Sequence, residues 1–144
     1  MIMGESSEAI HAMDAEQCWA RLRGEQLGRL AMSAGGEIDI FPINYVVDGE
    51  SLVFRTAPGT KLVEAVISSQ VALEIDGHTE ADAWSVVAKG PAARLEHQAE
   101  IDAADALPLT PWAPTLKYAY VRITPTTITG RWFDRSAEPE RSQF

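Results

Sequence analysis

A two-residue turn, Asp48-Gly49, constrains this chain most strongly, because it separates two apolar runs that both have the composition of β-strands. The first run spans residues 38–47 and the second spans residues 51–56. Asp-Gly suits a tight hairpin turn, since glycine readily adopts the positive φ angle that such a turn requires. The sequence therefore predicts an antiparallel β-hairpin close to the middle of the chain.

The end of this hairpin carries residue types that bind anions. Ala57-Pro58-Gly59 predicts a turn, and Thr60-Lys61 then begins a short helix expected over residues 61–69. Arg55 and Thr56 lie just before the turn. Free N–H groups at a helix start attract phosphate, and hydroxyl, ammonium and guanidinium groups add to this attraction. We predict a phosphate-binding corner here, with solvated surface charges as the alternative interpretation.

Further apolar runs predict a mainly β chain with a barrel or sandwich architecture. Pro42 cannot donate to a β-ladder, so it predicts an edge or a bulge in the hairpin. Gly90-Pro91 interrupts the longest run and predicts a bulge or a sharp bend that lets one strand serve two parts of a barrel. About seven strands are expected, and those outside the hairpin cover residues 27–33, 71–75 (ended by Asp76-Gly77), 83–96, 118–123 and 127–133.

Two more helices are expected besides the one after the hairpin. Asp14 and Gln17 have the spacing of a capping box, and Gly24 marks the end of that first helix. Residues 97–107 predict the other helix, which stops before Pro108.

Length and charge limit the classes of function. With 144 residues and a net charge of −9, the chain suits one domain that neither nucleic acid nor an anionic membrane attracts. No apolar run reaches the roughly 18 residues of a membrane span, no secretory signal is present, and the single cysteine fits a reducing compartment. We expect a cytoplasmic protein, with a domain over residues 14–135, a flexible segment over residues 1–13 and a loose tail over residues 136–144.

The residue types that bind metals or act as nucleophiles do not occur here at the spacings typical of such sites. No Ser-His-Asp arrangement, P-loop or dinucleotide fingerprint occurs, so no catalytic residue is nominated. No metal site is expected, because the histidines lie far apart; they are His11, His78 and His97.

Two tryptophans near predicted strand ends have two interpretations. Trp84 and Trp132 act either as core and interface anchors or as walls for a flat ring. Arg131, beside Trp132, pairs either with an anionic ligand or with a carboxylate of this acidic chain.

Four segments also occur in an order that resembles a known family: LGRLA, FPINYVVDGESLVFRTAPGTKL, WSVVAKGPA and VRITPTTITGRWF. Together they resemble the pyridoxamine 5′-phosphate oxidase-like, FMN-binding split β-barrel proteins, and in particular small bacterial members regarded as flavin-binding oxidoreductases. The resemblance implies a mainly β, Greek-key split barrel of six or seven antiparallel strands with two or three short helices. It also implies a homodimer with FMN at the subunit interface.

The resemblance assigns cofactor contacts to three groups of residues. The isoalloxazine ring is expected beside Pro42, Ile43, Asn44 and Tyr45. The ribityl chain and phosphate are expected at Arg55, Thr56, Thr60 and Lys61. The partner subunit is expected to contribute Trp84, Ser85, Arg131 and Trp132.

Three functions stay open on the sequence. The first is an FMN-dependent oxidoreductase acting on a small molecule. The second is a reductase that uses F420, a deazaflavin, although its longer anionic tail needs more cations than this chain offers near Lys61. The third is a non-enzymatic module that binds flavin or haem. Oxidation of a B6 vitamer is not expected, because an acidic tail follows Phe133 where full oxidases have a longer basic region.

Overall fold

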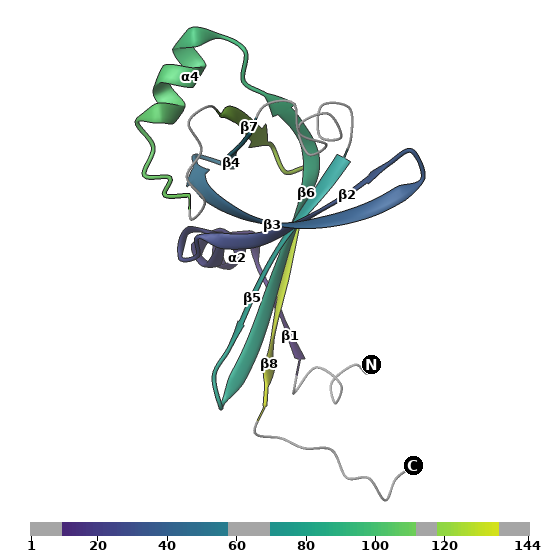
Figure 1. Cartoon of the computed structure of the whole chain (residues 1–144). Coiled ribbons are helices and arrows are strands. Elements are labelled where there is room, and N and C mark those ends of the chain that lie inside the picture. The colour runs from purple at the N-terminus through teal and green to yellow at the C-terminus, as the bar shows by residue number, and fades with distance from the viewer. Residues whose placement is uncertain (1–9, 58–69, 112–117, 136–144) are drawn as a thin grey trace, which may run out of the picture.

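The computed structural model describes residues 10–57, 70–111 and 118–135 of the chain. These residues form eight strands and two helices (Figure 1). The helix predicted over residues 61–69 and both terminal segments, residues 1–9 and 136–144, lie outside the described residues. The elements are β1 (Ile10–Met13), α2 (Ala15–Arg23), β2 (Leu27–Ala34), β3 (Glu37–Asp48), β4 (Ser51–Thr56), β5 (Gln70–His78), β6 (Asp82–Arg94), α4 (Gln98–Asp105), β7 (Ala119–Ile123) and β8 (Thr127–Asp134).

Six of the strands close into an antiparallel barrel. They follow the order β6-β5-β2-β3-β4-β7, and β7 pairs back onto β6. Strands β8 and β1 extend the sheet beyond β6 on its other side. The predicted mainly β split barrel is therefore confirmed, with β8 and β1 as additions to the closed ring.

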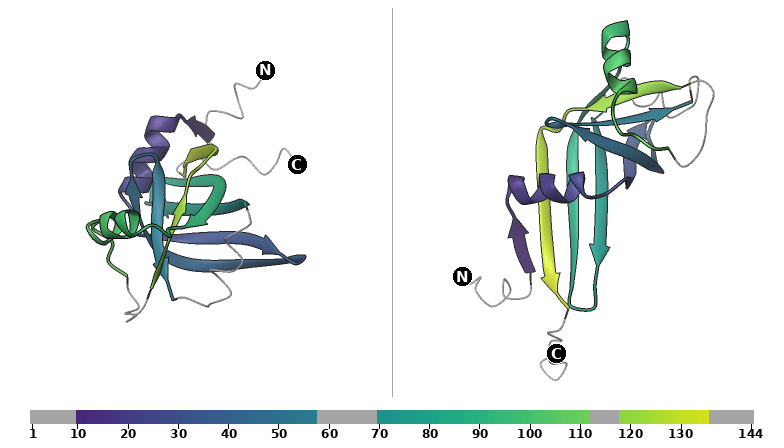
Figure 2. Two further views of the ribbon diagram at one scale, coloured as in Figure 1. Left: turned by 90° about the horizontal axis from the view of Figure 1, so that it is seen from above. Right: turned by 90° about the vertical axis from the view of Figure 1, so that its left-hand side faces the viewer.

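The central hairpin forms as predicted. Strands β3 and β4 pair from Tyr45–Phe54 to Asp48–Ser51, and Gly49 adopts a φ of 62° in the turn between them. The preceding hairpin, β2–β3, projects from the barrel (Figures 1 and 2). It turns at Gly35 and Gly36, whose φ angles of 59° and 83° are ones that side chains rarely adopt.

Strand β6 passes from one part of the barrel to the other at Gly90-Pro91. Residues up to Pro91 pair with β5, whereas Ala92–Arg94 pair with β7. A Cβ atom on residue 90 would overlap the carbonyl oxygen of Thr124, so the close approach of these backbones requires glycine. The predicted double role of this strand is confirmed.

Helix α2 packs against the sheet of β5, β6 and β8 (Figure 2), and its predicted capping box is present. The Asp14 carboxylate accepts from the Gln17 N–H at 2.8 Å, and the Asp14 N–H donates to Gln17 Oε1 at 2.9 Å. The buried Cys18 and Leu22, one helical turn apart, join the barrel core. The Gly24 N–H donates to carbonyls of the last turn and ends the helix. Neither described helix is long and apolar enough to cross a membrane.

Strand β5 is longer than predicted, because Asp76-Gly77 lies inside it rather than at a turn. Gly77 pairs with Trp84, and a Cβ atom at residue 77 would lie 2.8 Å from the Trp84 ring. The glycine therefore accommodates an indole ring. The turn comes later, where the Thr79 hydroxyl accepts from the N–H of Asp82 at 3.1 Å.

Residues Ile10–Met13 form a strand that the sequence analysis placed in a flexible segment. They pair with β8 from Ile10–Phe133 to Met13–Gly130. The edge of β8 offers unpaired backbone groups, and a four-residue segment satisfies them whatever its own strand propensity.

Candidate functional site

The four residues predicted beside the flavin ring lie on β3 and alternate between its two faces. Ile43 and Tyr45 are 8% and 3% exposed and belong to the barrel core. The Tyr45 hydroxyl donates to the Leu22 carbonyl at 2.7 Å, and burial raises the pKa of this phenol far above its usual range. Only Pro42 and Asn44 direct side chains to the outer face, so Ile43 and Tyr45 can contact an outside ligand only through their backbone.

Pro42 lies where β3 has a strand partner on one side. It pairs with Arg29 of β2, and the pairing of β3 with β4 begins only at Tyr45. Among the described strands, none lies on the other side of residues 37–44. The predicted edge position of Pro42 is confirmed, because a residue without an N–H group is tolerated there.

Arg55 lies at the end of β4 in a cluster of polar and aromatic groups. Its guanidinium carbon is 4.2 Å from the centroid of the Tyr118 ring. The Asp105 carboxylate accepts from the hydroxyls of both Tyr118, at 3.0 Å, and Tyr120, at 2.6 Å. Arg55 Nε is buried and has no hydrogen-bond partner among the described residues. A buried N–H of a cation that lacks an acceptor makes Arg55 a candidate to bind an anionic group.

The sequence analysis did not identify Asp105, Tyr118 or Tyr120. Asp105 ends a helix for which the sequence predicted only the range 97–107, and it lies 50 positions after Arg55. No local motif joins two positions so far apart. Thr56, the neighbour of Arg55, is half-buried at the end of β4, whereas Thr60 and Lys61 lie outside the described residues.

The residues predicted to come from a partner subunit separate into two pairs. The register of β6 and β8 places Trp84 opposite Trp132, and Ser85 opposite Arg131. Because neighbouring residues in a strand point to opposite faces, the tryptophans lie on the α2 side and the other two on the outer face. Trp84 is 7% exposed and belongs to the core.

The tryptophan pair is engaged within its own chain. The guanidinium of Arg21 lies 4.6 Å from the Trp84 ring centroid. His11 of β1 stacks on Trp132 with ring centroids 4.1 Å apart. These contacts match the interpretation of both tryptophans as anchors of the fold.

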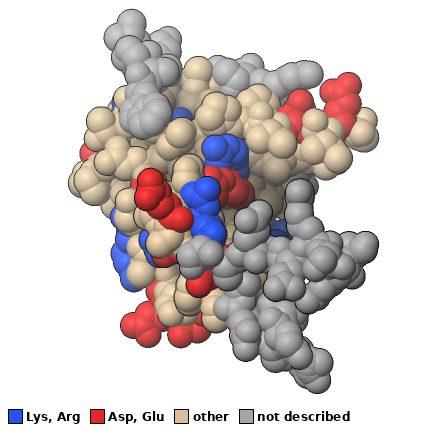
Figure 3. Space-filling model, turned by 90° about the horizontal axis from the view of Figure 1, so that it is seen from below, with Lys and Arg blue, Asp and Glu red and all other residues tan. Residues whose placement is uncertain are grey.

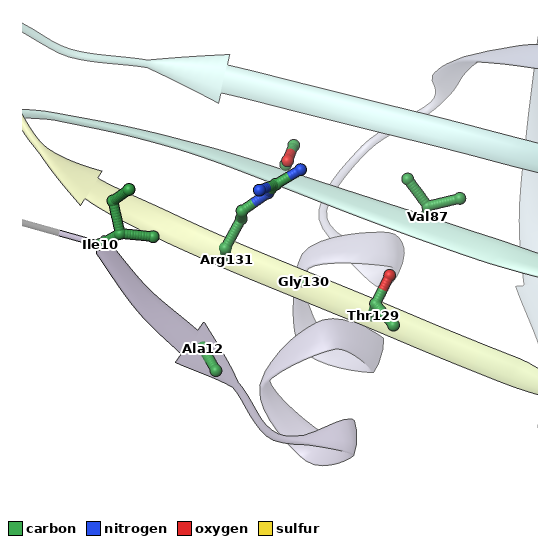
Figure 4. A pocket seen from close by; sticks show the side chains of 7 residues that line it. Ile10, Ala12, Val87, Thr129, Gly130 and Arg131 are labelled. Carbon is green, nitrogen blue, oxygen red and sulfur yellow. The ribbon is translucent and has the colours of Figure 1, made fainter. Parts of the chain in front are cut away.

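Ser85 and Arg131 line a shallow pocket on the outer face of β1, β8 and β6, with a volume of about 330 Å³. Figure 4 shows Arg131 and Thr129 on β8, Val87 on β6, and Ile10 and Ala12 on the short strand β1. The pocket is mostly apolar, and Arg131 is its only cation. Strands β5 and β2 lie between this pocket and β3 in the sheet, so one chain does not bring Arg131 to Asn44.

The outer face between these two regions carries one group of ion pairs. Arg29 contacts Glu74 at 3.1 Å and Asp76 at 2.8 Å. Burial and the neighbouring Asp76 raise the pKa of Glu74, while Arg29 opposes them. Figure 3 shows basic side chains beside acidic ones among the described residues on the side seen there.

Apolar side chains border this group of ion pairs. Ile38 and Ile40, on the projecting part of β3, are 76% and 65% exposed. They lie on the same face of the strand as Pro42 and Asn44, because all four occupy even positions of one strand. Exposed apolar side chains in such a series indicate an interaction surface.

The six-stranded split barrel defines a small β-barrel protein, and the buried Arg55 Nε without a partner among the described residues marks a candidate anion site beside its central hairpin. The chain belongs to the pyridoxamine 5′-phosphate oxidase family, whose profile matches residues 14–132. The resemblance drawn from the four sequence segments is thereby confirmed.

Individual relatives agree with this assignment. An uncharacterized protein of Mycobacterium tuberculosis is 45% identical over 98 residues, which are 68% of this chain and 89% of the relative. An FAD binding protein of Mycobacterium smegmatis has a similar structure, with a TM-score of 0.76 and 39% identity over 85% of this chain and 97% of the other. A conserved protein of unknown function from Corynebacterium diphtheriae has a TM-score of 0.76 and 38% identity, covering 87% and 98% of the two chains.

Proposed function

We propose that this protein binds a flavin nucleotide and uses it in an oxidoreductase reaction on a small molecule. The buried Arg55 Nε is the observation that carries the proposal, since it needs an acceptor and stands five residues before Thr60. Membership of the family and the similarity to an FAD binding protein support the choice of a flavin.

The residues of the corner have distinct roles in this proposal. Arg55 and Lys61 hold the phosphate, with the hydroxyls of Thr56 and Thr60 as additional donors. The backbone of residues 42–45 runs beside the ring, where only Pro42 and Asn44 direct side chains outwards. A bound flavin supplies the electron or hydride transfer, while the protein orients the ring and hydrogen-bonds its nitrogens.

FMN and FAD are both compatible with these roles. They share the isoalloxazine ring, the ribityl chain and the first phosphate, and the proposed site binds these shared parts. FMN is the expectation from the sequence, whereas the M. smegmatis relative is described as binding FAD. F420 is the alternative cofactor, and its longer anionic tail demands cations beyond Arg55 and Lys61.

We also propose that a second copy of the chain completes the site. In this arrangement Ser85 and Arg131 of one chain face β3 of the other, across an interface that covers the exposed Ile38 and Ile40. A two-fold axis makes both sites equivalent and buries the same apolar face twice. The wide separation of the two regions in the sheet supports a shared site.

Flavin titration tests the cofactor proposal. FMN, FAD and F420 are titrated side by side into purified protein, with fluorescence quenching as the readout. The double variant Thr60→Ala/Lys61→Ala should weaken the preferred flavin by about 1.5–3 kcal/mol, or about 10- to 100-fold, because a charged phosphate contact is lost.

A matched control and two outcomes decide the result. Arg23→Ala, which removes an exposed cation at the end of α2, should leave the affinity unchanged. Wild-type protein that ignores micromolar flavin contradicts the proposal. Bound flavin that neither NADH nor NADPH reduces, and that no acceptor reoxidises, supports a non-enzymatic binding module instead.

A further inference from the structure

We propose that Asp105, acting through Tyr118 and Tyr120, positions the guanidinium of Arg55 for the cofactor phosphate. Asp105 is the last residue of α4, so a helix outside the barrel would set how tightly the corner holds a phosphate. This inference rests on the proposed flavin function.

One carboxylate oxygen fixes two aromatic rings. Asp105 Oδ1 accepts from the Tyr118 hydroxyl at 3.0 Å and from the Tyr120 hydroxyl at 2.6 Å. The two rings meet edge to face, with centroids 5.3 Å apart and planes at 75°. Because both hydroxyls donate to one carboxylate oxygen, neither side chain can swing away from Asp105 without losing a hydrogen bond to a carboxylate, which is stronger than one to a neutral acceptor.

The Tyr118 ring, held in this way, contacts the guanidinium of Arg55. The guanidinium carbon lies 4.2 Å from the Tyr118 centroid, a distance typical of a cation over an aromatic face. Stacking uses the flat face of a guanidinium and leaves its in-plane N–H groups for an acceptor. Arg55 Nε, buried and without a partner among the described residues, is one of these groups.

The charge of Asp105 is satisfied without an ion pair to Arg55. The described residues contain three ion-pair contacts, and neither Asp105 nor Arg55 takes part in any of them. Burial, and then Asp105, raise the pKa of Tyr120 far above its usual range, although Arg55 acts in the opposite direction. Tyr120 therefore stays a hydroxyl donor at working pH.

A purely structural role for Asp105 is the competing explanation. Helix α4 packs on the barrel through Val53, Leu95, Ala104 and Tyr120. Its N-cap, His97, makes no side-chain capping bond, so the hydrogen bonds of Asp105 also help to dock the helix. The two roles predict different losses of affinity. If Asp105 positions Arg55, only the phosphate contact weakens; if Asp105 only stabilises the fold, binding of the whole flavin weakens.

A comparison of FMN with riboflavin, which lacks the phosphate, separates the two roles. The variants are Asp105→Ala, Asp105→Asn and Tyr118→Phe, each titrated with both ligands under the conditions used for wild type. Asp105→Ala and Tyr118→Phe should each weaken FMN about tenfold, as expected when a charged hydrogen bond is misaligned. Riboflavin affinity should change by less than about twofold, and Asp105→Asn, which keeps one acceptor oxygen, should recover part of the loss.

The control is Asp102→Ala on the same helix, whose carboxylate accepts from Gln98 at 2.8 Å on the exposed side. It should leave both affinities unchanged. Equal losses for FMN and riboflavin, or no loss for FMN, overturn the positioning role. Should Asp105→Ala fail to fold by circular dichroism, Tyr118→Phe decides alone, because it keeps the ring. Wild-type protein that binds neither ligand overturns the proposed function itself.

Discussion

Neighbouring residues of one strand have opposite roles in this protein. On β3, Asn44 directs its amide to the outer face and donates to the Gln26 carbonyl at 3.3 Å, whereas Tyr45 reaches into the core and holds the end of α2. On β8, Arg131 lines the outer pocket and Trp132 packs beside α2. Adjacent residues of one motif therefore divide between the outer face, where the ligand is proposed to bind, and the support of the fold, as strand alternation requires.

Substitution of Tyr45 tests this division at the scale of one residue. Tyr45→Phe removes the shorter of two hydrogen bonds to the Leu22 carbonyl and leaves the one from the Glu25 N–H at 3.4 Å, so it should destabilise the fold by about 1 kcal/mol. Flavin affinity should not change in the folded variant. Urea unfolding and flavin titration measure the two effects, and Tyr118→Phe is the contrasting variant, expected to change FMN affinity. A change in flavin affinity for Tyr45→Phe would place its hydroxyl in the site.

Helix α2 shows how one element supports several strands. Its N-terminus is capped by its own residues, its Cys18 lies against β8, and its Leu22 carbonyl receives Tyr45 of β3. A Cβ atom at Gly130 would lie 2.6 Å from Cys18 Sγ, so the helix and β8 are in close contact. The position of Arg131 on that strand thus depends on α2 as well as on the sheet.

Removal of the helix cap tests this support at the scale of the element. Asp14→Ala should destabilise the protein by about 1 kcal/mol, because the N–H of Gln17 loses its acceptor. Thermal unfolding measures the effect. Asp14→Asn, which keeps a capping oxygen, should restore most of the stability, and equal losses for both variants would contradict the capping role.

At the scale of the whole molecule, the outer face of the sheet connects the two halves of the proposed site. It extends from the pocket of β1, β8 and β6, across the Arg29 ion pairs, to the exposed Ile38 and Ile40. In Figure 1, α4 lies beside β4 and β7 at the top of the view, whereas α2 lies below β3. A second copy on the outer face would leave α4 uncovered.

Charged residues on the projecting hairpin test this assembly. Ile38→Glu/Ile40→Glu should convert a dimer to a monomer, since like carboxylates would face each other across the two-fold axis. Flavin binding should weaken as well, because the site would lose Arg131 of the second chain. Light scattering after size-exclusion chromatography measures the mass. Ala103→Glu, on the exposed side of α4, is the control and should remain dimeric. A wild-type protein that is monomeric at tens of micromolar would contradict the shared site.

The sequence alone determined the elements whose causes are local. Asp48-Gly49 predicted the central hairpin and Asp14 with Gln17 predicted the capped helix, because each depends on contacts within a few residues. Gly90-Pro91 predicted the shared strand from its composition, although the contact that requires glycine there is with Thr124. The order of the four segments also identified the family. The predicted site residues within the described part of the chain all lie on strands, but their faces and contacts were not all predicted.

Only the tertiary structure decided which side chains meet. It placed Tyr45 in the core, brought Asp105 to the tyrosines beside Arg55, and paired Ile10–Met13 with the edge of β8. It also kept Asp76-Gly77 within β5, where Gly77 makes room for Trp84. These outcomes depend on register and packing between residues far apart in the chain, where many small contacts together outweigh local propensity.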